Sequence, residues 1–209
     1  FSRVLVETPA FIVNSFLYSG IAVGICLLVG VPIAWIMART RIPGRELLDS
    51  LNTLILAIPG TAIGIAYVRA FHFELPVLGI AFTSLWLIMP TVLAVRRLPY
   101  TVRGSYASML LVHRSLEEAA GSVGASGLRT FRDITLPLTW RGILVGSLFS
   151  FMTSLQEASA VLFLSLGGWE TLTVGIFNFY IAGSMSEAAA LGFIMIVVAA
   201  VSLIVINRV

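Results

Sequence analysis

The chain has 209 residues, of which 58% are hydrophobic and only 11% are charged, and its formal net charge is +3. Soluble domains carry roughly 25% charged residues, so this chain has too few polar side chains to cover a surface that faces water. Together with a mean hydropathy of +1.01, the composition excludes a soluble globular protein and predicts an integral membrane protein.

Lysine and cysteine usage narrow the chemistry further. All 13 basic residues are arginine, so the chain lacks the lysine of a phosphate-binding loop and the lysine of a Schiff-base enzyme. A single cysteine, Cys26, excludes a disulfide within the chain. The chain therefore cannot carry a phosphate-loop nucleotide site or a Schiff-base lysine. Separately, we expect no catalytic residue, no cofactor and no metal site in this chain.

Five apolar stretches are long enough to cross a membrane, which takes about 20 residues of helix. Proline lies inside or near the end of three of them, which membranes tolerate when neighbouring helices bond the freed carbonyl groups. The predicted fold is an all-α membrane protein with about five transmembrane helices, in a single domain over residues 1–209. The stretches are 11–37, 51–68, 77–95, 142–166 and 187–206.

Arginine placement orients these helices, because cytoplasmic loops of membrane proteins are enriched in basic residues. Eleven arginines fall on one side and two, Arg3 and Arg69, on the other. The prediction is an N-terminus outside the cell, a cytoplasmic C-terminus and a large cytoplasmic loop over residues 96–141. The eleven are Arg39, Arg41, Arg45, Arg96, Arg97, Arg103, Arg114, Arg129, Arg132, Arg141 and Arg208.

Part of this loop is rich in small residues: residues 117–137 read EEAAGSVGASGLRTFRDITLP. Ser115 and Glu118 have the spacing of a capping box, which predicts a helix that begins at Ser115. Ala120 and Gly124, four positions apart, would share a bare face that another backbone can approach closely. Each glycine lowers helix stability by about 1 kcal/mol, and a helix that needed only to be stable in water would not keep them. The sequence therefore favours a docking helix, and an alanine-rich connecting loop is the alternative.

A second short helix is predicted directly downstream. Leu128, Phe131 and Ile134 recur every third residue and form an apolar stripe. Leu136 and Pro137 then begin the fourth transmembrane helix, where the missing N–H of proline costs nothing. This second helix would brace the docking helix against the membrane.

The spacing of these residues resembles a known motif. Three residues, EAA, are followed after three positions by glycine and after nine more by Ile-x-Leu-Pro, which is similar to the EAA motif of permease subunits from type I ABC importers. The resemblance implies a MetI-like permease core with a coupling helix within residues 113–137. The matching residues are Glu118, Ala119, Ala120, Gly124, Ile134, Leu136 and Pro137.

The resemblance also assigns roles and partners. Glu118 would make the polar contact to a cytoplasmic ATPase dimer, the small residues of the motif would let the helix seat deeply, and Leu136 and Pro137 would hold it rigidly against the next span. ATP would be bound by the ATPase, so this chain would be a transport subunit and not an enzyme.

Further partners follow from the same resemblance. A second permease domain, either an identical copy or a fused half of a longer polypeptide, would complete the pathway, and an extracytoplasmic binding protein would deliver the substrate. The chain would lie among lipids of a bacterial or archaeal inner membrane and would bind no nucleic acid.

Two strings bear on the substrate. Residues 57–67, AIPGTAIGIAY, and residues 154–164, SLQEASAVLFL, resemble permeases of the ferric-iron group most closely. Thiamine, phosphonate and polyamine permeases have similar strings and are the alternatives.

Glu157 and the neighbouring Gln156 lie inside the fourth predicted span, past its middle. An ionised group deep in a bilayer costs at least about 2.5 kcal/mol, so it normally faces a cavity or a partner. The functional hypothesis is a pathway or gate residue, with Glu157 as an oxygen ligand for a cation. The alternative is a structural hydrogen bond between spans, for example to Thr153 on its own helix or to a hydroxyl elsewhere.

A short string suggests a different class of protein: residues 124–127 read GASG and match the serine motif of rhomboid-type proteases. Such an enzyme needs its serine buried in the membrane with a histidine on another span. Ser126 instead lies in the arginine-bearing loop, and neither His72 nor His113 is within a span. The sequence therefore disfavours an intramembrane serine protease.

Overall fold

The computed structural model describes residues 9–40, 43–73, 81–165 and 167–208. Within these ranges the regular structure is helical. In chain order the elements are α2 (Pro9–Arg39), α3 (Arg45–Ala57), α4 (Gly60–Phe71), η1 (Phe82–Ser84), α5 (Ile88–Leu111), α6 (Arg114–Ser122), α7 (Gly127–Thr130), η2 (Phe131–Thr135), α8 (Leu136–Leu155), α9 (Val161–Leu164), α10 (Leu172–Ile181) and α11 (Met185–Arg208).

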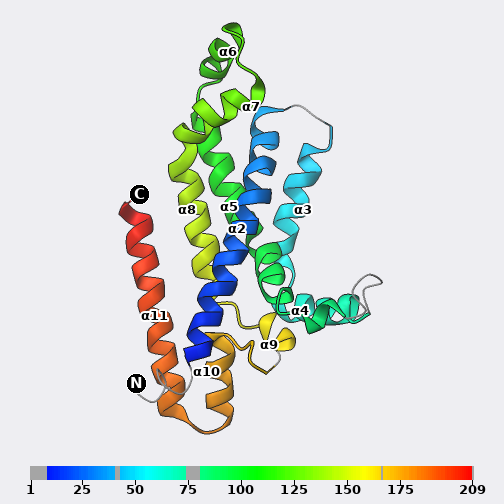
Figure 1. Cartoon of the computed structure of the whole chain (residues 1–209), viewed down its shortest axis with the longest axis vertical. Coiled ribbons are helices and arrows are strands. Elements are labelled where there is room, and N and C mark those ends of the chain that lie inside the picture. Colours follow the sequence, from blue (N-terminus) through cyan, green and yellow to red (C-terminus); the bar gives the residue numbers. More distant parts are fainter. Residues whose placement is uncertain (1–8, 41–42, 74–80, 166, 209) are drawn as a thin grey trace.

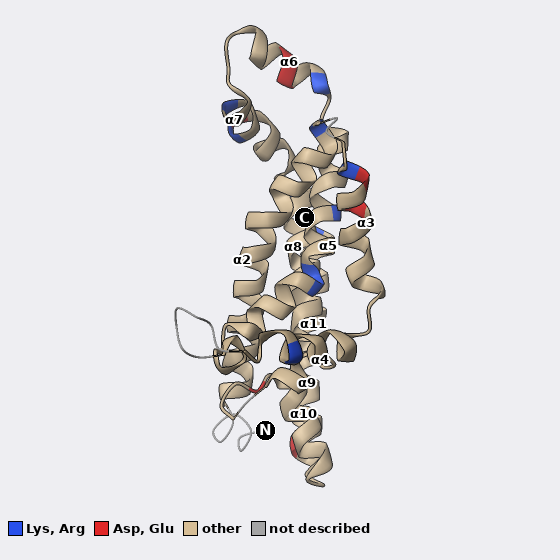
Figure 2. Ribbon diagram, turned by 90° about the vertical axis from the view of Figure 1, so that its right-hand side faces the viewer, with Lys and Arg blue, Asp and Glu red and all other residues tan. Residues whose placement is uncertain are grey.

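The long helices α2, α3, α5, α8 and α11 run along the long axis of the molecule, α6 and α7 form one end, and α4, α9 and α10 lie toward the other (Figure 1). By length and composition, three described helices can cross a membrane: Pro9–Arg39, the continuous helix Gly127–Leu155, and Met185–Arg208. A fourth crossing is possible if α3 and α4 count as one broken span. Charged residues gather around α6, α7 and the start of α3 (Figure 2).

Helices α5 and α8 approach each other through glycine. A Cβ built on Gly104 of α5 would lie 2.8 Å from the Cα of Gly146 and 2.9 Å from the carbonyl oxygen of Gly142, both on α8. Small residues are typical of membrane helix interfaces, because close packing replaces the hydrophobic driving force that lipid cannot supply. The glycines therefore allow α5 and α8 to pack backbone against backbone.

The second predicted span, 51–68, is not one straight helix. Helix α3 ends at Ala57, α4 begins at Gly60, and the two axes differ by 105°. Pro59 cannot donate a backbone hydrogen bond and restricts the residue before it to extended conformations, as Ile58 shows with φ −80° and ψ 127°. The prediction of an uninterrupted span was therefore wrong at this proline.

The third predicted span, 77–95, was also misplaced. Residues 77–80 lie outside the described part of the chain, and α5 runs from Ile88 to Leu111. Arg96, Arg97 and Arg103 are therefore on a helix and not in a cytoplasmic loop. The predicted span ended before Arg96 because a count of consecutive apolar residues cannot detect a distant partner that pairs with the arginines.

The position of Arg96 and Arg97 on α5 lowers the number of arginines that can be used to orient the helices. Arg96 lies fifteen positions before the end of α5, which is about 22 Å along the helix axis, so Arg96 and its neighbour Arg97 cannot count with the arginines around α6. Without Arg96, Arg97 and Arg103, eight arginines remain on the side predicted to be cytoplasmic, against Arg3 and Arg69 on the other, and the orientation of the termini stays a prediction. The start of α2 and helix α6 do lie at opposite ends of the molecule (Figure 1).

Candidate coupling segment and buried arginine cluster

Helix α6 corresponds to the docking helix that the sequence predicted. It begins at Arg114, and its N-cap is His113, whose side chain accepts a hydrogen bond from the backbone N–H of Ser115. The capping box of Ser115 and Glu118 was therefore wrong. Glu118 is instead exposed, and its carboxylate forms no hydrogen bond or ion pair within the described ranges, so it is free to contact another molecule.

Gly124 lies in a different place from the one predicted. Helix α6 ends at Ser122, and Gly124 follows it with φ +84°. The N–H of Ala125 donates to the carbonyl of Ala120 and the N–H of Gly124 to that of Gly121, both at 3.0 Å. This is a Schellman motif, in which glycine supplies the left-handed residue that ends the helix. Gly124 therefore terminates the helix and does not share a helical face with Ala120.

We expect Gly124→Ala to destabilise the end of α6 by about 1–2 kcal/mol, since an alanine would be held in the left-handed conformation. Gly121→Ala is the matched control, because nothing lies within 4 Å of its added Cβ and alanine favours a helix by about 1 kcal/mol. Amide hydrogen exchange of α6 measures both effects. Equal exchange rates in the two variants would contradict the assigned role of Gly124.

Leu136 and Pro137 lie in the first turn of α8, as predicted. No break precedes them, because α7, η2 and α8 form one continuous helix over Gly127–Leu155. The five residues of η2, Phe131–Thr135, are a π-helical turn in which the N–H of Leu136 donates to the carbonyl of Phe131. Proline removes one helical donor and crowds the preceding turn, and a π-turn is one way to absorb it. The motif thus places a bend in the helix beside α6.

Two of the other motif residues, Ala120 and Ile134, line a hollow between α6 and the helix that contains α7 and η2. The hollow has a volume of about 250 Å³. Ala119, Leu136 and Pro137 are exposed. Two apolar side chains of this end, Val123 and Leu128, are 85% and 79% exposed. The hollow is lined by Ala120, Val123, Ala125, Arg129, Thr130, Asp133 and Ile134.

Sequence reasoning missed the residue beside Glu118. The carboxylate of Glu117 points inward: its Oε1 accepts from Nε of Arg39 at 2.9 Å and from Oγ1 of Thr135 at 2.7 Å. These three residues come from α6, α2 and η2. Nothing in the motif spacing indicated that Glu117 turns inward while its neighbour Glu118 turns outward.

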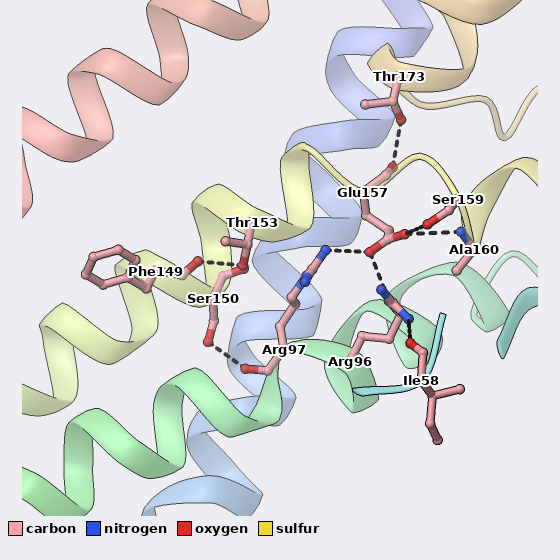
Figure 3. A network of polar contacts seen from close by, with 10 residues as sticks. All are labelled: Ile58, Arg96, Arg97, Phe149, Ser150, Thr153, Glu157, Ser159, Ala160 and Thr173. Atoms are coloured by element: carbon pink, nitrogen blue, oxygen red, sulfur yellow. Dashed lines mark hydrogen bonds and ion pairs between the residues drawn. The ribbon is translucent and has the colours of Figure 1, made fainter. Parts of the chain in front are cut away.

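Glu157 occupies a second site, at a break in the fourth predicted span (Figure 3). Helix α8 ends at Leu155, and residues 156–160 connect it to α9. Gln156 is exposed, whereas Glu157 is buried with 4% of its surface exposed. Its position inside a continuous transmembrane helix was therefore wrong, and the structure does not bring Gln156 into the same site.

Two arginines of α5 neutralise Glu157. Its Oε2 accepts from Nε of Arg96 at 2.9 Å and from Nη2 of Arg97. Its Oε1 accepts from the hydroxyl of Ser159 at 2.8 Å and from the N–H of Ala160 at 3.1 Å. The suggested partner Thr153 instead donates to the carbonyl of Phe149 on its own helix (Figure 3).

The same cluster joins the two broken segments of the chain. Nη1 of Arg96 donates to the carbonyl of Ile58 at 3.4 Å, at the bend between α3 and α4. A Cβ on Gly64 of α4 would lie 2.7 Å from the carbonyl oxygen of Ala160. Non-helical backbone at membrane depth persists only where protein or a water-filled cavity surrounds it. The cluster supplies that protein environment.

Two arginines and one carboxylate leave this cluster with a net positive charge. Both oxygens of Glu157 already accept hydrogen bonds, so it is a poor ligand for a cation. Within the described ranges, no three His, Cys, Asp or Glu side chains come together as a metal site would require. The arrangement suits an anion better than a metal ion.

Comparison with known proteins assigns the family. Residues 30–209 match the family described as "Binding-protein-dependent transport system inner membrane component". The chain belongs to this family. Its members are transport components, which confirms the prediction of a transport subunit and not an enzyme, and the prediction of a multi-pass membrane protein agrees with it.

Relatives of this transport component differ in substrate. The molybdenum permease ModB of Escherichia coli is 35% identical over 198 residues, which cover 90% of this chain and 86% of ModB. The ferric permease FbpB of Actinobacillus pleuropneumoniae is 32% identical over 187 residues, which cover 90% of this chain and 27% of FbpB. The sulfate permease CysT of Salmonella typhimurium is 30% identical and matches 82% of this chain and 64% of CysT. The chain spans about a quarter of the length of the ferric permeases.

Solved structures confirm the fold of this transport component. A chain of the MetNI methionine ABC transporter matches with a TM-score of 0.69 at 16% identity, over 93% of this chain and 90% of that one. A chain of a bacterial alginate ABC transporter, in complex with an alginate-bound periplasmic protein, matches with a TM-score of 0.71 at 19% identity, over 95% of this chain and 76% of that one. The MetI-like prediction was therefore right.

Proposed function

We propose that this chain is the membrane-spanning permease subunit of a binding-protein-dependent ABC importer and that α6 is its coupling helix. The observation that carries the proposal is the outward carboxylate of Glu118, on a helix at the end of the molecule beside a hollow and two exposed apolar side chains. A helix presented in this way fits a groove on a soluble protein, here a cytoplasmic ATPase dimer that binds the ATP.

The remaining partners are proposed with it. A second permease domain, identical or fused, completes the pathway, and an extracytoplasmic binding protein docks at the end that holds α4, α9 and α10. Membrane lipid surrounds the apolar lengths of α2 and α11. The family description supports this assembly because it refers to binding-protein-dependent transport systems.

Ferric iron is the substrate proposed from the sequence resemblance, and the ferric relatives support it. An oxyanion is the second candidate, because Arg96 and Arg97 converge on one buried carboxylate oxygen and guanidinium groups bind tetrahedral oxyanions as readily as carboxylates. The molybdenum and sulfate relatives agree with that candidate.

The docking proposal is tested by co-purifying the chain from membranes with candidate ATPase and binding-protein subunits. Ala119→Trp adds bulk on the exposed side of α6 and is expected to lower ATPase recovery at least tenfold, since a misfitted side chain removes the close approach that docking needs. Leu203→Trp, on the exposed face of α11, is the control and should leave recovery unchanged. Unchanged recovery with Ala119→Trp would refute α6 as the docking helix.

Substrate identity is tested in the same assembly after reconstitution into vesicles. Uptake of labelled ferric iron, molybdate and sulfate is compared with ATP present inside the vesicles. Uptake of iron alone supports the first candidate, and uptake of either oxyanion supports the second.

A further inference from the structure

Reciprocal arginine bonds tie α6 to the end of α2. Arg39, the last residue of α2, reaches toward α6: its Nε pairs with Glu117 at 2.9 Å and its Nη2 donates to the carbonyl of Val112, just before α6, at 2.9 Å. Arg114, the first residue of α6, reaches back and donates from Nη2 to the carbonyl of Ala38 at 3.0 Å. Arg114 thus binds backbone at the end of α2, whereas Arg39 binds the side chain of Glu117 on α6 and the backbone at the end of α5, which leads into α6.

The bonds between α2 and α6 are shielded from water, which strengthens them. The side chains of Arg39 and Glu117 are only 7% and 18% exposed, so water screens their pairing little. The carbonyl of Ala38 is among the last four of α2, which have no partner inside the helix. Cations at a helix C-terminus also interact favourably with its dipole.

A third element meets the same carboxylate. Oγ1 of Thr135 donates to Oε1 of Glu117 at 2.7 Å, and Thr135 itself is fully buried. Thr135 is the last residue of the π-helical turn that leads into α8. One carboxylate oxygen therefore joins the docking helix to α2 and to the bend at the start of α8.

We propose that Glu117 is a positioning residue that transmits movement of α6 to α2 and α8, while Glu118 contacts the ATPase. This inference rests on the proposed function of α6. The two adjacent glutamates have different roles, because Glu118 faces outward and takes up the force, whereas Glu117 faces inward and passes it to two membrane helices at once. Without Glu117, α6 can follow the ATPase while the membrane helices stay behind.

The test measures the ratio of substrate molecules transported to ATP molecules hydrolysed in the reconstituted assembly, with labelled iron, molybdate and sulfate as parallel probes. Glu117→Gln keeps the size of the side chain and removes its charge. We expect it to retain the ATPase on purification but to lower the transport ratio about tenfold, the factor that corresponds to one charge-assisted hydrogen bond. Thr135→Val, which leaves the ion pair intact, should lower the ratio by a smaller factor.

Two controls separate this proposal from the docking proposal. Glu118→Gln should reduce ATPase recovery instead of the ratio; if recovery is unchanged, Glu118 is not the contact to the ATPase, whereas the role of Glu117 is judged from the transport ratio alone. Asp49→Asn removes the carboxylate of an exposed pair with Arg103, whose atoms are 3.7 Å apart, and such surface pairs contribute little, so its ratio should be unchanged.

A double-mutant cycle completes the design. If Arg39 and Glu117 act through their shared bond, Arg39→Gln combined with Glu117→Gln should lower the ratio by less than the product of the two single effects. A normal ratio for Glu117→Gln would overturn the proposal, as would loss of the ATPase from that variant. If Glu117→Gln does not fold in the membrane at all, Thr135→Val decides: a normal ratio there also overturns the proposal.

Discussion

Replacing Glu157 with leucine is expected to lower the stability of the membrane domain by about 3–5 kcal/mol, the cost of removing one partner from a buried ion pair. Arg96 and Arg97 would keep their charges in side chains that are each 13% exposed, and no other carboxylate is bonded to them in the described residues. The measurement is the midpoint of thermal unfolding of the purified chain in detergent.

The control for this prediction is Glu46→Leu, at an exposed position of α3, where the change in stability should stay within about 0.5 kcal/mol. Combining Glu157→Leu with Arg97→Leu should recover part of the loss, because well-packed apolar replacements for both members of a buried pair are often neutral. An unfolding midpoint of Glu157→Leu equal to that of the wild type would mean that the cluster does not stabilise the bundle.

Replacing Gly104 with alanine is expected to separate α5 from α8 and to cost about 1–3 kcal/mol, the usual range for overpacking. The added Cβ would meet backbone atoms at 2.8 and 2.9 Å, and backbone cannot move aside as a flexible side chain can. The same thermal unfolding measurement applies, together with the recovery of folded chain from membranes.

Gly24→Ala on α2 is the matched control, because nothing lies within 4 Å of its added Cβ. Alanine favours a helix over glycine by about 1 kcal/mol, so this variant should be as stable as the wild type or slightly more stable. The close approach of α5 and α8 would be disproved by a Gly104→Ala protein that unfolds at the same temperature as Gly24→Ala.

Much of the fold could be predicted from local sequence. The apolar stretches 11–37 and 187–206 correspond to α2 and α11, because a long uncharged run has few alternatives to a membrane helix. The motif spacing over residues 118–137 identified the segment that forms α6, α7 and η2. The turn at Gly124 could not be predicted, because a glycine inside a helix and a glycine that ends a helix look alike in sequence.

Prediction failed where a residue depends on a distant partner. The third span was ended at Arg96 because two adjacent arginines read as the edge of a membrane. They are tolerated on α5 because Glu157, 61 positions after Arg96, pairs with both of them. Glu157 in turn was placed inside a helix because the bend after Leu155 leaves no strong local signal.

By itself, the sequence determined the membrane class of this protein, the helices with long uncharged runs and the segment that carries the EAA-like motif, since length, polarity and spacing are properties of consecutive residues. Only the tertiary structure decided which charges are buried and what holds them. It turned Glu117 toward Arg39 and Glu118 toward solvent, and it joined Glu157 to Arg96 and Arg97. The reason is physical: the free energy of a charge inside a membrane protein depends on the groups around it in space, and those groups come from helices far apart in the chain.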